Sequence, residues 1–125
     1  FSYTGICGEF RETAPQYGFI ERYNKGKEIT TGIAHEPWHF RYVGYPHSYW
    51  IEYNDLSLEE YIQYIKNYPY EGEHLSIKQR GTEISVFFAE SKEGKTEIEL
   101  SDHDLYQISG NNVDGFIVTV WRQCL

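Results

Sequence analysis

The sequence predicts an α+β protein whose helices and short strands are followed by a C-terminal antiparallel β unit. Residues 57–66 repeat apolar side chains as an amphipathic helix does, whereas residues 38–43 alternate as a strand does. After position 69 the apolar pattern changes to a period of two, which is typical of antiparallel sheets. We therefore divide the chain into residues 1–69 and a small β appendage, residues 70–125.

The first predicted element is a helix over residues 5–17, because four apolar residues recur at spacings of four, four and three positions. These residues are Ile6, Phe10, Ala14 and Tyr17. Gly18 is a suitable stop residue after this helix. The next segments are short: we predict a strand at 18–23, a turn at 24–27 and a β-leaning stretch at 28–34 that Gly32 interrupts.

The stretch HEPWH, residues 35–39, matches the zinc-protease pattern H-E-x-x-H, which requires a helix. Pro37 argues against a helix, because it lacks an amide hydrogen and would clash with the preceding turn at a cost of about 3 kcal/mol. We read HFRYV as a strand, 38–43, that places His39, Arg41 and Val43 on one face and Phe40 and Tyr42 on the other. A helical zinc site with both histidines as ligands remains an alternative.

The clearest predicted helix covers residues 57–66. Ser57 and Glu60 have the spacing of a capping box, in which each side chain bonds the other residue's amide. The apolar stripe of this helix consists of Leu58, Tyr61, Ile62 and Ile65. In the β appendage we predict strands at 84–89, 96–100 and 116–121, a hairpin turn at 91–95 and a loop at 109–115.

The composition disfavours several classes of partner. The chain of 125 residues has a net charge of −8, which disfavours nucleic-acid phosphates and anionic membrane surfaces. No apolar run approaches the roughly 20 residues that span a bilayer. The chain contains no methionine, so we expect a processed product or part of a longer protein. Its two cysteines, Cys7 and Cys124, can be free or paired, and the sequence does not define an oligomeric state.

The string EPWHFRYVG has a wider context, with EFRETAPQYGFIERYNKGKEITTGIAH before it and LSLEEYIQYI after it. Over residues 5–66 the sequence resembles the zinc D-alanyl-D-alanine carboxypeptidases and dipeptidases of the vancomycin-resistance type, which share the hedgehog-like fold. The resemblance implies helices packed against a small antiparallel sheet whose face carries the site. It also implies hydrolysis of peptides that end in D-Ala-D-Ala, as in peptidoglycan stem peptides and their precursors.

The same resemblance gives roles to individual residues. It implies that His39 is the last of three zinc ligands, that Glu36 is the catalytic base and that Trp38 lies at the wall of the cleft. Arg41 is a candidate to contact a substrate carboxylate, with a structural ion pair as the alternative. His47 is a candidate to line the mouth of the cleft or to support a zinc ligand, with a satisfied loop histidine as the alternative.

The family's ligand pattern is incomplete in this sequence. Its first two ligands are a His and an Asp seven residues later, and no histidine here has an Asp at that distance. We therefore expect the C-terminal part of a carboxypeptidase, lacking two zinc ligands and with little activity alone. The alternative is a catalytically silent module that binds cell-wall material or another protein. The resemblance implies a bacterial cell-envelope location, or a cytoplasmic one for a dipeptidase-type member.

Overall fold

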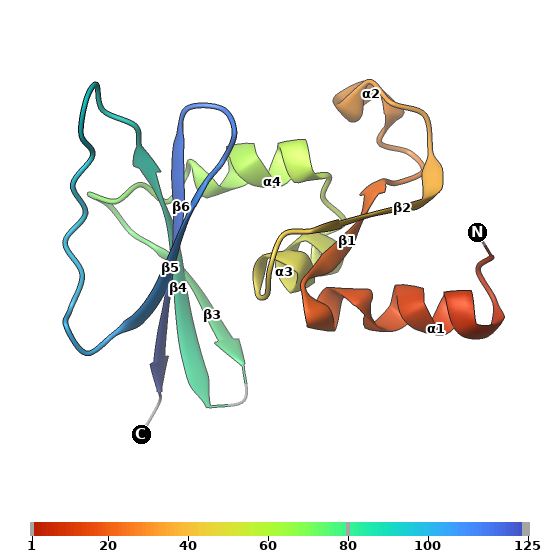
Figure 1. Ribbon diagram of the computed structural model, residues 1–125, viewed down its shortest axis with the longest axis horizontal. Helices are drawn as coiled ribbons and strands as arrows, with labels where there is room; N and C mark the ends of the chain where they lie inside the picture. Colours follow the sequence, from red (N-terminus) through yellow and green to blue (C-terminus); the bar gives the residue numbers. More distant parts are fainter. Residues whose placement is uncertain (1, 80, 124–125) are drawn as a thin grey trace. The chain divides into compact units, whose positions relative to one another are not determined.

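The computed structural model describes residues 2–79 and 81–123 (Figure 1). Its contacts divide the chain into two compact units, the N-terminal unit Phe1–Tyr61 and the C-terminal unit Ile62–Leu125. Helices with a two-stranded antiparallel sheet come first, and a four-stranded antiparallel sheet follows. This arrangement confirms the predicted α+β class.

The N-terminal unit combines helices with one antiparallel pair of strands. In chain order the elements are α1 (Gly5–Thr13), the 3-10 helix η1 (Ala14–Tyr17), β1 (Phe19–Tyr23), α2 (Glu28–Thr31), β2 (Glu36–Tyr42), α3 (His47–Tyr53) and α4 (Leu58–Ile65), which continues into the second unit. The strands predicted at 18–23 and 38–43 are confirmed as β1 and β2, and β2 begins earlier than predicted, at Glu36.

The first predicted helix is confirmed as α1 followed by η1. Gly18 ends it in the left-handed region, with φ at 90°, which a glycine adopts without strain. The predicted apolar stripe is not buried, however, because Ile6 is 82% exposed and only Ala14 of the four residues is buried. Cys7 in α1 forms no disulfide within residues 2–79 and 81–123. Cys124 lies outside the described residues, so the pairing of the two cysteines stays open.

The stretch predicted as β-leaning, residues 28–34, instead begins with the short helix α2. The carboxylate of Glu28 accepts a hydrogen bond from the amide of Gly26 at 2.8 Å, which stabilises the entry to the helix. Gly32 ends the helix with φ at 75°. These local contacts decide the structure against the β propensity of the side chains. The helix α3 was not among the predicted elements.

The capping box of α4 is confirmed. The amide of Ser57 donates to Glu60 at 2.8 Å, and the amide of Glu60 donates to the Ser57 hydroxyl at 3.0 Å. Next to this cap, Arg22 of β1 forms a two-pronged ion pair with Glu59, at 2.8 and 2.9 Å. The hydrogen bonds between them raise the pKa of Arg22 and lower the pKa of Glu59. The pair therefore ties β1 to the start of α4.

The core of the N-terminal unit includes a histidine. His47, the first residue of α3, is 8% exposed, and its Nδ1 lies 2.5 Å from the Tyr61 hydroxyl. The two rings meet edge to face with centroids 5.7 Å apart. Burial lowers the pKa of His47 to about 4, so the imidazole is neutral at pH 7. The other buried residues of this unit include Ala14, Ile20, Ser48, Ile51 and Ser57.

The C-terminal unit contains an antiparallel sheet with the strand order β3-β4-β6-β5 (Figure 1). The strands are β3 (Leu75–Gln79), β4 (Thr82–Glu90), β5 (Leu105–Gly110) and β6 (Gly115–Gln123). The central strand β4 is buried on both faces over residues 84–87. The sheet confirms the predicted C-terminal antiparallel β unit.

One face of this sheet is covered by a segment without ladder pairing. The buried cluster consists of Phe87, Val118 and Val120, with Tyr70, Ile98 and Leu100 packed against it. The strand predicted at 96–100 is wrong, because this stretch pairs with no strand in the described part of the chain. Its alternation is real, since Ile98 and Leu100 point to the cluster. The amide of Glu99 donates to the Tyr70 hydroxyl at 2.8 Å.

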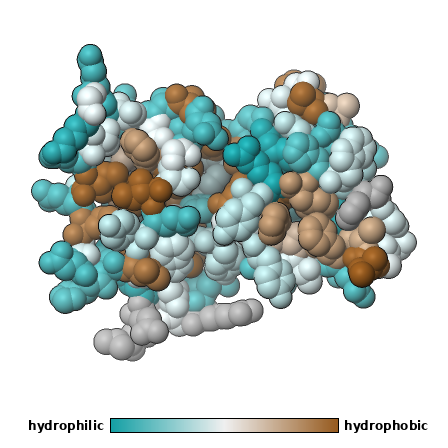
Figure 2. Space-filling model, in the orientation of Figure 1, coloured by the Kyte–Doolittle hydropathy of each residue, from teal (hydrophilic) through white to brown (hydrophobic). Residues whose placement is uncertain are grey.

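The edge strand β5 is exposed along its whole length. Leu105 is 70% and Ile108 is 44% exposed, and apolar side chains reach the surface elsewhere as well (Figure 2). Such an edge can pair with another strand. Among residues 2–79 and 81–123, no helix has both the length and the apolar character needed to cross a membrane.

Candidate active site

The two strands of the N-terminal unit lose their regular register at one place. Glu21 pairs with Phe40 and Tyr23 pairs with Glu36, so three residues of β2 lie opposite a single residue of β1. We call these three, residues 37–39, the irregular segment. Its proline has no amide hydrogen to donate to the ladder, which explains why regular pairing stops there.

Glu36 directly precedes the irregular segment, and its side chain lies beside that of His39, the last residue of the segment. Residues three apart on a regular strand point to opposite faces, yet Oε2 of Glu36 is 2.8 Å from Nδ1 of His39. The extra residues of the segment turn the backbone and bring the two side chains together. The side chains are 28% and 44% exposed, so both are accessible. The ring of Tyr23 meets His39 edge to face at 5.2 Å.

His35 is directed elsewhere. The helical zinc site is wrong, because HEPWH enters a strand at Glu36 instead of forming a helix. Nε2 of His35 lies 2.9 Å from the hydroxyl of Tyr3 and 3.3 Å from Oε1 of Glu21. His35 and Glu36 are consecutive in the chain but contact different residues. His35 lies beside Glu21, and Glu36 lies beside His39.

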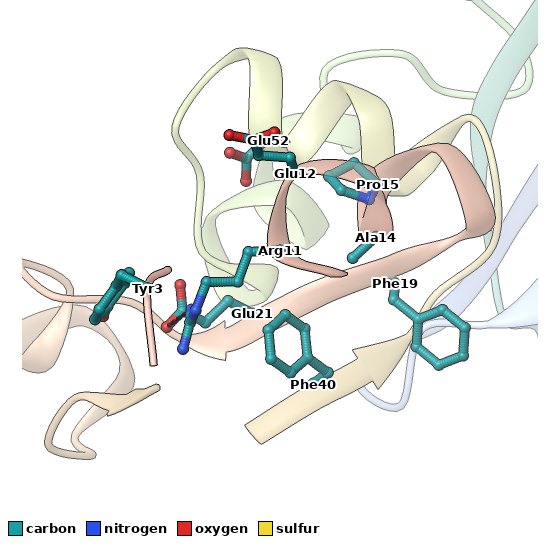
Figure 3. Close-up of a pocket in the computed structure, with 9 residues that line it drawn as sticks. All are labelled: Tyr3, Arg11, Glu12, Ala14, Pro15, Phe19, Glu21, Phe40 and Glu52. Atoms are coloured by element: carbon teal, nitrogen blue, oxygen red, sulfur yellow. Dashed lines mark ion pairs between the residues drawn. The ribbon is translucent and has the colours of Figure 1, made fainter. Parts of the chain in front are cut away.

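Arg11, in the last turn of α1, connects the helix to both strands. Its Nη1 lies 2.9 Å from Oε1 of Glu21, and its Nη2 donates a hydrogen bond to the carbonyl oxygen of Pro37. The guanidinium lies over the ring of Tyr3 at 4.1 Å and near the ring of Phe40 at 5.4 Å. Figure 3 shows Arg11 reaching Glu21 with Phe40 alongside. No periodicity in the sequence pointed to this network.

Two open pockets adjoin the network. One of about 250 Å³ is lined by Arg11 among others (Figure 3), and one of about 730 Å³ is lined by His35 among others. The lining residues that they share are Tyr3, Glu21 and Glu52. Burial, together with the charges of Glu21 and Asp55, raises the pKa of Glu52. The second pocket is rich in carboxylates, because its lining includes Glu21, Glu28, Glu52 and Asp55.

The remaining predicted site residues lie in different surroundings. Trp38, in the irregular segment, is 61% exposed. Arg41 is exposed, lies opposite Ile20 in the ladder and forms no ion pair within the described residues, so the structural ion pair is not observed. His47 is 8% exposed and bonded to Tyr61 at the start of α3, so it does not lie in a loop; its predicted roles at the mouth of a cleft or in support of a zinc ligand stay predictions.

The Glu36–His39 pair fits one corner of a zinc centre. Across the part of the chain that the structure describes, no group of three His, Cys, Asp or Glu side chains could hold a metal. The pair nonetheless offers imidazole and carboxylate, which are donor types that zinc uses. Oε2 of Glu36 and Nδ1 of His39 lie within hydrogen-bond distance, and which atom donates depends on the tautomer of the imidazole. The hydrogen lies on Nδ1 wherever the carboxylate acts as the acceptor. A metal at Nδ1 would replace that hydrogen and leave Glu36 beside it.

Residues 1–45 match the family described as VanY, D-alanyl-D-alanine carboxypeptidase. The chain is 43% identical over 110 residues to a D-alanyl-D-alanine carboxypeptidase of Enterococcus faecium, covering 88% of this chain and 35% of that protein. It is 48% identical over 69 residues to the bifunctional D-Ala-D-Ala dipeptidase and carboxypeptidase VanXYC of Enterococcus gallinarum, covering 48% of this chain and 36% of that protein.

A crystal structure is also similar, that of the vancomycin resistance D,D-dipeptidase VanXYg in complex with a D-Ala-D-Ala phosphinate analogue. The match has a TM-score of 0.94 and 54% identity, and covers 98% of this chain and 49% of that chain. The chain is thus homologous to the D-Ala-D-Ala carboxypeptidases and dipeptidases, which confirms the resemblance predicted from the sequence. It spans about a third of the length of these two curated relatives and about half of the solved chain.

Proposed function

We propose that the chain is the C-terminal part of a zinc-dependent D,D-carboxypeptidase that hydrolyses D-Ala-D-Ala termini of peptidoglycan stem peptides or their precursors. The observation that supports this most directly is the Glu36–His39 pair, two accessible groups at 2.8 Å in a chain homologous to such enzymes. Wall peptides as substrates would place the protein in the bacterial cell envelope. A dipeptidase-type member would instead act in the cytoplasm.

Glu36 would act as the general base. Its carboxylate would accept a proton from the attacking water and later donate that proton to the amine of the leaving D-alanine. His39 would hold the metal through Nδ1, because this is the nitrogen that faces Glu36. When bound, zinc would polarise the scissile carbonyl and lower the pKa of a bound water.

Two exposed neighbours are proposed to contact the peptide. Arg41 forms no ion pair among the described residues, so its guanidinium is available for the terminal carboxylate of the substrate. Trp38 presents an exposed aromatic surface next to His39, which suits the methyl groups of D-alanine. We propose no substrate contact for His47, because it is buried.

A full centre requires ligands beyond the Glu36–His39 pair, because tight zinc sites use three or four protein groups. We propose that a His and an Asp from outside this chain complete it, as the family resemblance implies. The 125 residues alone should then bind zinc weakly and release little D-alanine from a D-Ala-D-Ala peptide.

The test uses the full-length protein that contains this chain. We expect about one zinc per molecule by elemental analysis, a strong loss of zinc in His39→Ala, and unchanged zinc in His103→Ala, an exposed loop residue that serves as the control. The wild type should release D-alanine from a peptide ending in D-Ala-D-Ala and should release no L-alanine from its L-Ala-L-Ala counterpart. A wild type without zinc and without hydrolysis would refute the proposal and favour a silent binding module.

A further inference from the structure

The position of the Glu36–His39 pair depends on a piece of backbone that the ladder does not hold. Residues 37–39 have no pairing partner in β1. Backbone groups outside a ladder need other partners to keep a fixed conformation. Whatever holds this irregular segment therefore also sets the distance between the carboxylate and the imidazole.

Arg11 contacts the backbone of this segment. Its guanidinium donates to the carbonyl oxygen of Pro37, the first residue of the irregular segment. Its second contact is the ion pair with Glu21 at 2.9 Å, and Glu21 pairs with Phe40, where the regular register resumes. One planar group thus connects the irregular segment to the regular ladder beside it.

The surroundings of Arg11 fix the guanidinium itself. The side chain is 11% exposed, and Glu21 is 19% exposed, so water competes little for their contact. The ring of Tyr3 lies under the guanidinium at 4.1 Å, and the Nε donates to the Ser2 carbonyl at 3.3 Å. A planar group with several donors suits this place, because it can serve a carbonyl and a carboxylate at once.

We propose that Arg11 is a positioning residue for the Glu36–His39 pair. It acts through the Pro37 carbonyl. The inference rests on the proposed function for its catalytic consequence, while its structural part concerns this chain alone. A role limited to anchoring α1 would predict a loss of stability without a change at the pair.

The first test measures kcat and KM for D-alanine release by the zinc-loaded full-length protein. We expect Arg11→Ala to lower kcat about 100-fold with little change in KM, since small displacements of reacting groups have effects of this size. Arg11→Lys should recover part of kcat, because an ammonium can serve one of the two partners. The control is Glu59→Gln, which breaks the comparable ion pair with Arg22 and should leave kcat unchanged at a similar loss of thermal stability.

The second test does not need hydrolysis. In the zinc-free full-length protein, the ¹⁵N shifts of the His39 ring should show the hydrogen on Nδ1, bonded to Glu36. Arg11→Ala should shift the ring toward a tautomer mixture, and Glu59→Gln should not. Unchanged His39 shifts in Arg11→Ala, or an equal fall of kcat in the control, would overturn the inference. A wild type that releases no D-alanine would refute the proposed function. The ¹⁵N shifts of the His39 ring would then test the positioning role of Arg11 by themselves.

Discussion

Acidification should destabilise the N-terminal unit through the buried His47. Burial lowers its pKa from 6.5 to about 4 in the folded state, whereas the unfolded chain keeps it near the ordinary value. Between pH 6.5 and about 4, His47 therefore binds a proton in the unfolded state but stays neutral in the folded state. At about 1.4 kcal/mol per pKa unit, the resulting loss of stability is about 3 kcal/mol. It develops as the pH falls from 6.5 to about 4 and then stays constant.

The assay is urea unfolding at a series of pH values between 7 and 4, followed by tryptophan fluorescence, because Trp50 lies in α3 close to His47 in sequence. The variant His47→Gln keeps an amide that can bond Tyr61 but does not titrate. Between pH 7 and 4, its free energy of unfolding should therefore fall by about 3 kcal/mol less than that of the wild type. The variant His103→Gln, changed at an exposed position, should retain the wild-type slope. Equal slopes in wild type and His47→Gln would refute the reasoning.

Two further predictions concern stability. Ser57→Ala should lower the free energy of unfolding by about 1 kcal/mol, because the amide of Glu60 loses its cap, and urea unfolding measures the change; an unchanged midpoint would contradict it. Phe87→Ala should cost about 3–5 kcal/mol in the C-terminal unit, because it opens a cavity beneath Tyr70 and Val118. Calorimetry measures this second loss, and a value below about 1 kcal/mol would argue against the proposed core.

Elements whose signals are local were predictable from the sequence. The capping box at Ser57 and Glu60, with the stripe behind it, gave α4 because both bonds form within one turn. The stop at Gly18 was equally local. The β unit followed from the period-two pattern, since alternation reports which face is buried.

Features that depend on pairing were not predictable. Residues 96–100 alternate as a strand would, but they cover the Phe87 cluster without joining a ladder, and the pattern is the same in both cases. The stretch at 28–34 has β propensity, yet Gly26 and Glu28 form a local contact that favours a helix.

The candidate site was predicted in part. The letters EPWH indicated that Glu36 and His39 belong together, and the structure places them at 2.8 Å. The register change that brings them together arises from pairing with β1, which the sequence does not encode in a readable spacing. Arg11 was missed for the same reason, because its partners lie on other elements and its helix shows no related pattern.

The central claim is that Glu36 performs acid–base chemistry beside a metal held by His39. The most direct measurement is D-alanine release from a D-Ala-D-Ala peptide by the full-length protein, comparing wild type with Glu36→Gln at equal, measured zinc content. We expect the substitution to lower kcat about 100- to 10,000-fold, the range typical of a lost general base, while zinc stays bound. Equal rates in the two proteins would contradict the claim.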